Sequence, residues 1–240
     1  MTAEIKVFST NSMHAVLDEL VPAFERASGN RVSVSYETAI AMLKRIKNGE
    51  TADLAIMGTS ELDAVKGTSE FDELEKLGKI AADSRRVLSR FGVGIGVRAG
   101  APKPDIGSVE AFKRMLLNAK SIAYTLNGAS GIHFAGLIER LGIAEQVKAK
   151  AVTRPGGLIA ELVTAGEAEI AVQQIPELMA VPGIEVVGPL PQELQVIMMS
   201  SAGIFSDAKQ PGAARALLEF LSTPASARVF KAKGLEPAQG

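Results

Sequence analysis

Two short polar loops in this chain contain the residue types that bind small anions. The first, Ser9-Thr10-Asn11-Ser12, follows an apolar run at residues 5–8 and precedes a predicted helix from about Met13. The second, residues 125–131, follows a similar run and precedes a predicted helix from about Ile132. The first N–H groups of a helix have no partner within it and carry partial positive charge. Hydroxyl groups and glycines let an anion approach them, so we predict an anion-binding loop in each half.

The bulk composition excludes several classes of function. The 240 residues are 47% hydrophobic, which allows one large or two small domains. The net charge of −1 gives no electrostatic basis for a nucleic-acid partner. The chain has no cysteine, which excludes disulfides and thiolate chemistry. Its two histidines, His14 and His133, are too few for a His-rich metal site, so only carboxylates could bind a hard cation. We expect no cofactor and no metal. No apolar run approaches the roughly 20 residues of a membrane span, so we expect no membrane insertion.

Strand-like and helix-like segments alternate along the chain. Apolar runs predict strands at residues 5–8, 31–36, 53–57, 91–98, 122–124, 151–153, 169–173, 184–187, 194–199 and 202–205. Helical spacing predicts helices from about residue 13, from about 40, and at 109–118, 132–141, 158–165, 211–221 and 224–233. The stretch 60–79 is also predicted to be helical, with breaks at Gly67 and Gly78. This alternation predicts an α/β fold whose parallel sheets are covered by helices on both faces.

An ordered set of segments resembles the molybdate-type extracellular solute-binding proteins of ABC importers. The segments include residues 7–12, 49–56, 130–133, 166–172 and 230–235, and the resemblance covers essentially the whole chain. It implies the type II periplasmic-binding fold, with a parallel-rich mixed sheet in each of two lobes and a two-strand hinge. The implied lobes are residues 1–83 plus 190–240, and residues 84–189, with the ligand cleft between them. Residues 91–97 and 194–199 are then expected at or beside the hinge.

The resemblance also implies which residues bind the ligand. Ser12 matches a hydroxyl that the family uses in its first loop, and Thr38-Ala39 falls where a second, serine-rich run is absent. Gln174 falls where the family has a tyrosine. The full expected set is Thr10, Asn11, Ser12, Thr38, Ala39, Ser130, Gly131, His133, Arg154 and Gln174. Because this set mixes donors and acceptors, we predict that a small carboxylate-bearing anion binds more tightly than molybdate.

Each of these residues also has a purely structural interpretation. Ser12 and Ser130 are typical of helix caps, and a histidine in a first helical turn is commonly a packing residue. Arg154 can form a bidentate pair with a ligand carboxylate, or it can pair with an acid on the protein's own surface.

The function expected from the resemblance is capture of a small anion by a monomeric, non-enzymatic binding protein. An ABC permease is the implied partner and the periplasm the implied location, although the first residues lack the features of a signal peptide. A stand-alone cytosolic sensor of the same fold therefore stays open. An enzyme such as a hydrolase is the second alternative, but Gly128-Ala129-Ser130-Gly131 is not a G-x-S-x-G elbow and no phosphate loop is present.

Overall fold

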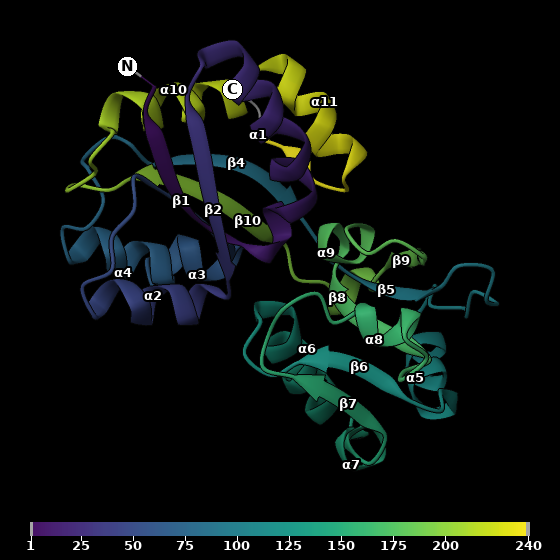
Figure 1. The fold of residues 1–240 in the computed structure, drawn as a ribbon. Coiled ribbons are helices and arrows are strands. Elements are labelled where there is room, and N and C mark those ends of the chain that lie inside the picture. Colours follow the sequence, from purple (N-terminus) through teal and green to yellow (C-terminus); the bar gives the residue numbers. More distant parts are fainter. Residues whose placement is uncertain (1, 239–240) are drawn as a thin grey trace. The chain divides into compact units, whose positions relative to one another are not determined.

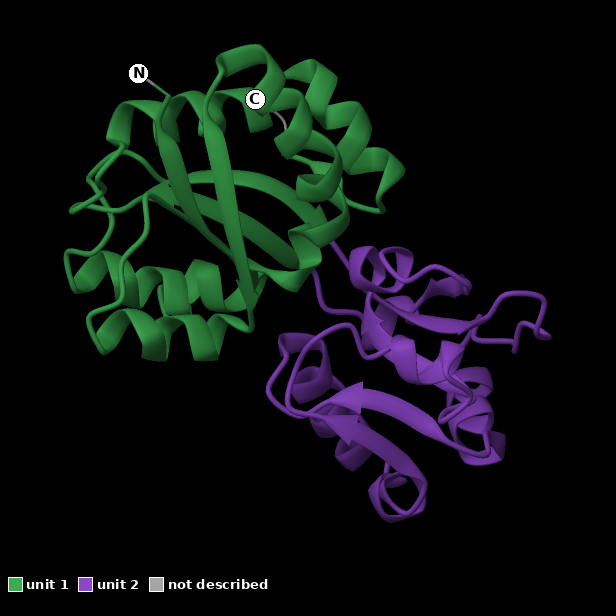
Figure 2. Ribbon diagram, viewed as in Figure 1, with its two compact units in different colours: residues 1–90, 198–240 green, residues 91–197 purple. Residues whose placement is uncertain are grey.

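The chain folds into two compact units, each with its own sheet and core (Figure 2). The computed structural model describes residues 2–238. Unit 1 takes its described residues from Met1–Arg90 and Met198–Gly240, and unit 2 is Phe91–Ile197. The chain thus passes between the units twice. Both observed boundaries lie later in the chain than the expected ones at 83/84 and 189/190. The first is later because the strand Arg86–Phe91 pairs in the unit 1 sheet, and the second because Leu190 and Leu194 pack into the unit 2 core.

The sheet of unit 1 has parallel strands at one side and antiparallel strands at the other. Its order is β11-β4-β10-β3-β1-β2, with β1 paired parallel to both β2 and β3, and with β10 antiparallel to β3. The strands are β1 Glu4–Thr10, β2 Arg31–Glu37, β3 Leu54–Ser60, β4 Arg86–Phe91, β10 Met198–Ile204 and β11 Glu236–Pro237.

Helices cover both faces of this sheet, as Figure 1 shows: α1, α10 and α11 lie over one face and α2, α3 and α4 over the other. In the first group, the ring centroids of Phe24 and Phe220 lie 5.5 Å apart. Under the second group, Phe8, Met42 and Phe71 are buried in one apolar cluster. The bounds are η1 Asn11–Met13, α1 His14–Ser28, α2 Ala39–Lys47, α3 Glu61–Lys66, α4 Glu70–Lys76, α10 Pro211–Leu221 and α11 Pro224–Ala232.

Unit 2 has a mixed sheet of the same general kind. Its order is β7-β6-β8-β5-β9, with β6 parallel to β7 and β8, and with β5 antiparallel to β8 and β9. The strands are β5 Val93–Arg98, β6 Ile122–Thr125, β7 Ala151–Arg154, β8 Ile170–Gln174 and β9 Ile184–Pro189. The helices are α5 Val109–Asn118, α6 Ala129–Arg140, α7 Ala144–Lys148, α8 Glu161–Thr164, α9 Ile175–Met179 and η2 Gln192–Leu194. The predicted α/β class is confirmed.

Two apolar layers cover the faces of the unit 2 sheet. Phe112 of α5 and Phe134 of α6 belong to one buried cluster, and Ile159, just before α8, and Leu178 of α9 belong to the other. Strands buried on both faces have near-continuous apolar sequence, which is why β8 shows no polar residue before Gln173.

The predicted strand at residues 194–199 is wrong, and a side chain explains why. Residues 192–194 form η2, and β10 starts at Met198 and continues to Ile204 as one strand. Between them, the Gln195 side-chain amide replaces backbone pairing. Its Oε1 accepts from the Val93 N–H at 2.9 Å, and its Nε2 donates to the Val93 carbonyl at 2.9 Å. The predicted break at Gly67 in the helical stretch 60–79 is confirmed, because Gly67, with φ 65°, ends α3 and Ser69 then caps α4.

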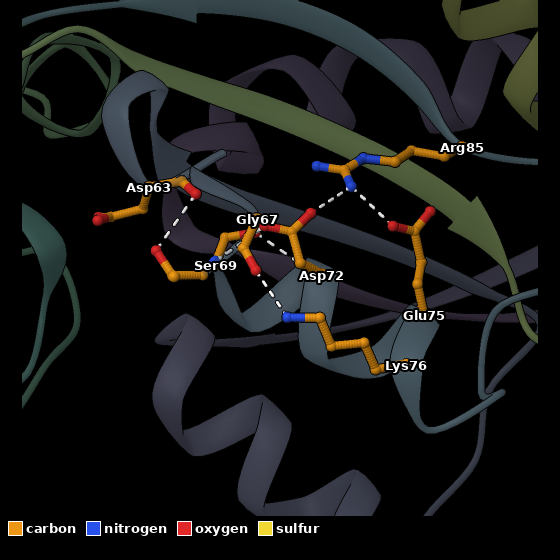
Figure 3. A network of polar contacts seen from close by, with 8 residues as sticks. Asp63, Gly67, Ser69, Asp72, Glu75, Lys76 and Arg85 are labelled. Atoms are coloured by element: carbon orange, nitrogen blue, oxygen red, sulfur yellow. Dashed lines mark hydrogen bonds and ion pairs between the residues drawn. The ribbon is translucent and has the colours of Figure 1, made fainter. Parts of the chain in front are cut away.

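A polar network fastens α4 to the segment that enters β4 (Figure 3). Arg85 Nη1 donates to Asp72 Oδ1 at 2.6 Å and to Glu75 Oε2 at 2.8 Å. Asp72 Oδ2 also accepts from the backbone N–H and the hydroxyl of Ser69, which completes a capping box. Burial opposes ionisation of Asp72, but the bonds from Ser69 and Arg85 outweigh it and hold the pKa of that carboxyl below its ordinary value.

Among residues 2–238, no helix is both long enough and apolar enough to cross a membrane. The same residues contain no group of three or more metal-ligating side chains suited to hold a metal ion.

Candidate functional site

In unit 1 the expected ligand residues lie where three parallel strands end. β1 ends at Thr10, β2 at Glu37 and β3 at Ser60, and the parallel pairing brings these ends to one edge of the sheet. A helix follows each strand within a few residues. Thr10, Asn11, Ser12, Thr38 and Ala39 all belong to this edge, which we call the unit 1 edge.

The hydroxyls of the first loop are tied to their own unit. Thr10 Oγ1 accepts from the Gly58 N–H at 3.0 Å and lies 3.2 Å from Ser12 Oγ. Both side chains are buried, and Asn11 between them is half-buried. Ser12 is therefore not the simple side-chain cap that its position allows, since no cap bond forms at the start of η1 or α1. The hydrogen bond to β3 holds the loop in a fixed conformation.

Thr38 caps α2 in the manner expected of a hydroxyl before a helix. Its Oγ1 accepts from the Ala41 N–H at 3.2 Å, and Ala39 is the first residue of the helix. A hydroxyl that accepts one bond retains its own proton to donate. The unit 1 edge therefore keeps a donor at Thr38.

Ser60 is a member of this edge that the sequence reasoning missed. It caps α3, with its Oγ accepting from the Asp63 N–H at 3.1 Å, and it also bonds the Asp63 carboxylate. The signal was available: a serine follows a buried strand and an acid follows three residues later.

In unit 2 the expected residues again gather at the carboxyl ends of parallel strands. β6 ends at Thr125, β7 at Arg154 and β8 at Gln174, which defines the unit 2 edge. α6 begins just after β6 with Gly128 at its N-cap and no side-chain cap. Its first N–H groups therefore lack the partner that a capping hydroxyl would supply.

The glycine in the first turn of α6 is required by packing. A Cβ atom on Gly131 would lie 1.7 Å from the Thr125 carbonyl oxygen, which no side chain can tolerate. Ser130 beside it is buried, with 1% of its surface exposed.

His133 and Arg154 both have partners within unit 2. His133 Nε2 lies 2.8 Å from the Leu194 carbonyl oxygen and must carry the proton for that bond. Burial lowers the pKa of His133, the bond to Leu194 opposes this, and Arg140 lowers it further, so the ring is neutral at pH 7. Arg154 Nη1 lies 3.2 Å from Glu161 Oε2, and its side chain is 42% exposed. The surface-pair interpretation therefore describes Arg154 in this structure.

Two adjacent glutamines at the end of β8 have different roles. Gln173 Oε1 accepts from the Ile159 N–H at 3.0 Å, and its Nε2 donates to the Gly157 carbonyl at 2.8 Å, which shapes the loop after β7. Gln174 is 6% exposed, and its Oε1 has no hydrogen-bond partner among the described residues. An unpaired buried acceptor costs about 1–3 kcal/mol, so an unoccupied acceptor at this edge is suited to a ligand donor.

Glu177 is a second residue that the sequence reasoning missed. It occupies the third position of α9, whose N-cap is Gln174, and it is 7% exposed. Burial raises the pKa of this carboxyl to about 8, against hydrogen bonds from the Gln173 side chain and the Gln174 backbone. Only its spacing from Gln174 was visible in the sequence, whereas its burial depends on the packed fold.

Comparison with known proteins gives a consistent family. A family model described as "Bacterial extracellular solute-binding protein" matches residues 5–236. A Pseudomonas protein named aconitate isomerase is 34% identical over 97% of this chain and 87% of its own length. The molybdate-binding protein ModA of Azotobacter vinelandii is 28% identical over 97% of this chain and 89% of its own.

A solved structure confirms the fold. The periplasmic molybdate-binding protein of Azotobacter vinelandii superposes with a TM-score of 0.79 at 16% identity, covering 98% of this chain and 100% of that one. The predicted resemblance to molybdate-type binding proteins, and with it the type II periplasmic-binding fold, is confirmed.

Proposed function

We propose that this chain, which belongs to the bacterial extracellular solute-binding protein family, binds a small organic polycarboxylate in preference to molybdate. One ligand molecule is bound per chain. An ABC permease is the proposed partner and the periplasm the proposed location, both from membership of the family.

The observation that carries the proposal is the buried Gln174 acceptor. Molybdate offers only acceptor oxygens at neutral pH, so it would leave Gln174 Oε1 unpaired. An organic acid with a hydroxyl group can donate to it, while a carboxylate of the same acid accepts from the first N–H groups of α6. The 34% identity to a protein named aconitate isomerase supports a tricarboxylic acid as the ligand.

Calorimetry with a matched ligand panel tests this proposal. Citrate, cis-aconitate, trans-aconitate, molybdate and sulfate are titrated separately into the full chain. We expect one site per chain, with at least one organic acid binding at least about tenfold more tightly than molybdate, which is 1.4 kcal/mol. Sub-micromolar molybdate binding with the organic acids inert would overturn the proposal.

Isomerisation of aconitate is the second candidate, favoured by the name of the same relative. Interconversion of the cis and trans acids by removal and return of an allylic proton needs a group that accepts a proton and gives it back. Proton NMR of each acid incubated with the protein distinguishes the candidates. Appearance of the other isomer would favour the enzyme, and unchanged spectra with tight binding would favour the binding protein.

A further inference from the structure

We infer that Gln173 is a positioning residue for the ligand: it holds the loop after β7 and, through that loop, the N-terminus of α6. This inference rests on the proposed function, in which the first N–H groups of α6 bind a ligand carboxylate. Gln173 lies outside the expected ligand set, and in this role it acts on the ligand without touching it.

The two glutamines at the end of β8 point to opposite faces of the unit 2 sheet, because successive side chains of a strand alternate. Gln173 shares its face with Ala171, which packs in the apolar cluster beside α8. Gln174 shares the other face with Val172, which packs in the cluster under α5 and α6. Gln173 therefore affects α6 only through the segments that lie between them.

The first of these segments is the loop after β7, which the Gln173 side chain fastens at two points. Its Oε1 accepts from the Ile159 N–H at 3.0 Å, and its Nε2 donates to the Gly157 carbonyl at 2.8 Å. Gly156 and Gly157, the latter with φ 87°, give this loop little stiffness of its own. Because Gln173 is only 1% exposed, its amide is a fixed support for the path of the loop.

The same loop is bonded to the segment that starts α6. The Leu126 N–H donates to the Arg154 carbonyl at 2.9 Å, and the Asn127 N–H donates to the Pro155 carbonyl at 3.0 Å. The next residue, Gly128, is the N-cap of α6. A displacement of the loop after β7 is therefore transmitted to the first turn of that helix.

The start of α6 has little room to move. A Cβ atom on either Gly128 or Gly131 would clash with Thr125, so the helix rests directly on the end of β6. Thr125 supports it on one side, and the loop after β7 holds its N-cap segment on the other. Hydrogen bonds weaken steeply away from their preferred distance and angle. Loss of the second support should therefore weaken the bonds that the N-terminus of α6 donates to a ligand.

Gln173→Met tests this role, because methionine has a similar length and can form neither bond. Citrate and trans-aconitate are titrated by calorimetry into the full chain at neutral pH. We expect affinity to fall about tenfold or more, which is about 1.4 kcal/mol or one charge-assisted hydrogen bond. Amide hydrogen exchange without ligand follows the route. The Asn127 N–H should exchange at least about tenfold faster in Gln173→Met, because its acceptor on Pro155 is no longer held.

Lys150→Met is the matched control. Lys150 Nζ donates to the Leu117 and Ala119 carbonyls, both at 2.6 Å, so this variant also removes two side-chain bonds to the backbone of unit 2. Lys150 lies just before β7, at the end of that strand opposite the unit 2 edge. Citrate affinity in Lys150→Met should stay within about twofold of the unsubstituted chain.

Thermal unfolding of each variant without ligand verifies that it is folded. Gln173→Asn keeps the amide on a side chain one methylene shorter, and it replaces Gln173→Met if that variant does not fold. It should show the same two effects, in affinity and in exchange at Asn127, to a smaller degree.

The outcomes separate this inference from the proposal beneath it. Unchanged acid affinity in a folded Gln173 variant would overturn the positioning role, and so would unchanged exchange at Asn127. An equal loss of affinity in Lys150→Met would overturn it too, because the effect would then be general destabilisation of unit 2. Failure of both acids to bind the unsubstituted chain would instead overturn the proposed function, and this inference with it.

Discussion

The imidazole of His133 is bonded to the main chain of Leu194, with Nε2 and the carbonyl oxygen 2.8 Å apart. The bond joins the N-terminal half of α6, where His133 is the fifth residue, to η2, just before the chain leaves unit 2 for β10. A residue in the expected ligand set thus has a structural partner 61 residues away.

Replacing His133 by alanine should destabilise unit 2 by about 0.5–1.5 kcal/mol, the usual net value of one hydrogen bond. The effect should also depend on pH. Because the folded pKa lies below the ordinary 6.5, the unfolded chain binds the proton more readily, and stability falls as pH drops below about 6.5. Urea unfolding between pH 5 and 8 measures both effects. Equal pH dependence in His133→Ala and the unsubstituted chain would contradict this assignment.

Gly131→Ala should be severely destabilising. The added Cβ would meet the Thr125 carbonyl oxygen at 1.7 Å, so α6 must shift away from β6, at a cost of about 3 kcal/mol or more. Gly136→Ala is the matched control, because the same helix leaves open space there. It should stabilise the chain by up to about 1 kcal/mol through helix propensity. Thermal unfolding of the two variants gives the comparison, and similar melting temperatures would count against the close approach.

Arg85→Ala should cost about 2–4 kcal/mol, because it leaves Asp72 buried without its cation. The pKa of Asp72 in the folded chain lies below its ordinary value of 3.8. Its contribution to the stability of the fold is therefore present above pH 3.8 and is lost as the pH falls below that value. Arg215→Ala, at an exposed position of α10, should change stability by less than about 0.5 kcal/mol. Denaturant unfolding at pH 7 and pH 3 checks both points, and a neutral Arg85→Ala would show that the network of Figure 3 contributes little.

Glu177→Gln should flatten the pH dependence of stability in the absence of ligand. The folded pKa of about 8 lies above the ordinary 4.5, so the protonated acid stabilises the fold fully below pH 4.5. That stabilisation is lost as pH rises toward 8, where the folded chain must also ionise a buried group. Melting temperatures between pH 4 and 9 test this expectation. A steeper decline in the variant than in the unsubstituted chain would be inconsistent with a buried neutral acid.

Ser130→Ala should weaken organic-acid binding by about 1.5–3 kcal/mol if the Ser130 hydroxyl donates to a ligand carboxylate at the unit 2 edge. Alanine suits this test better than a bulky residue, because Ser130 is 1% exposed. Thr153→Ala, exposed on β7, serves as the control and should leave binding unchanged. Calorimetry with citrate decides the matter, and unchanged affinity in Ser130→Ala would remove that hydroxyl from the site.

The sequence was sufficient to predict the elements and the loops that follow them. Helix and strand periodicity are local signals, so the strands before Ser9 and before Thr125 and the helices after them were predictable. The break at Gly67 was predictable for the same reason, because glycine is a local signal for a helix end, and the structure ends α3 there before Ser69 caps α4.

Only the tertiary structure decided which of these residues meet. The bond from Gly58 to Thr10 spans 48 residues, and the amide of Gln195 pairs with the backbone of Val93 across 102. The high pKa of Glu177 likewise follows from burial, which depends on β5, β8 and β9 packing around a single short helix. Hydrogen bonds and desolvation of this kind arise from distant segments brought together, so no local pattern in the chain could reveal them.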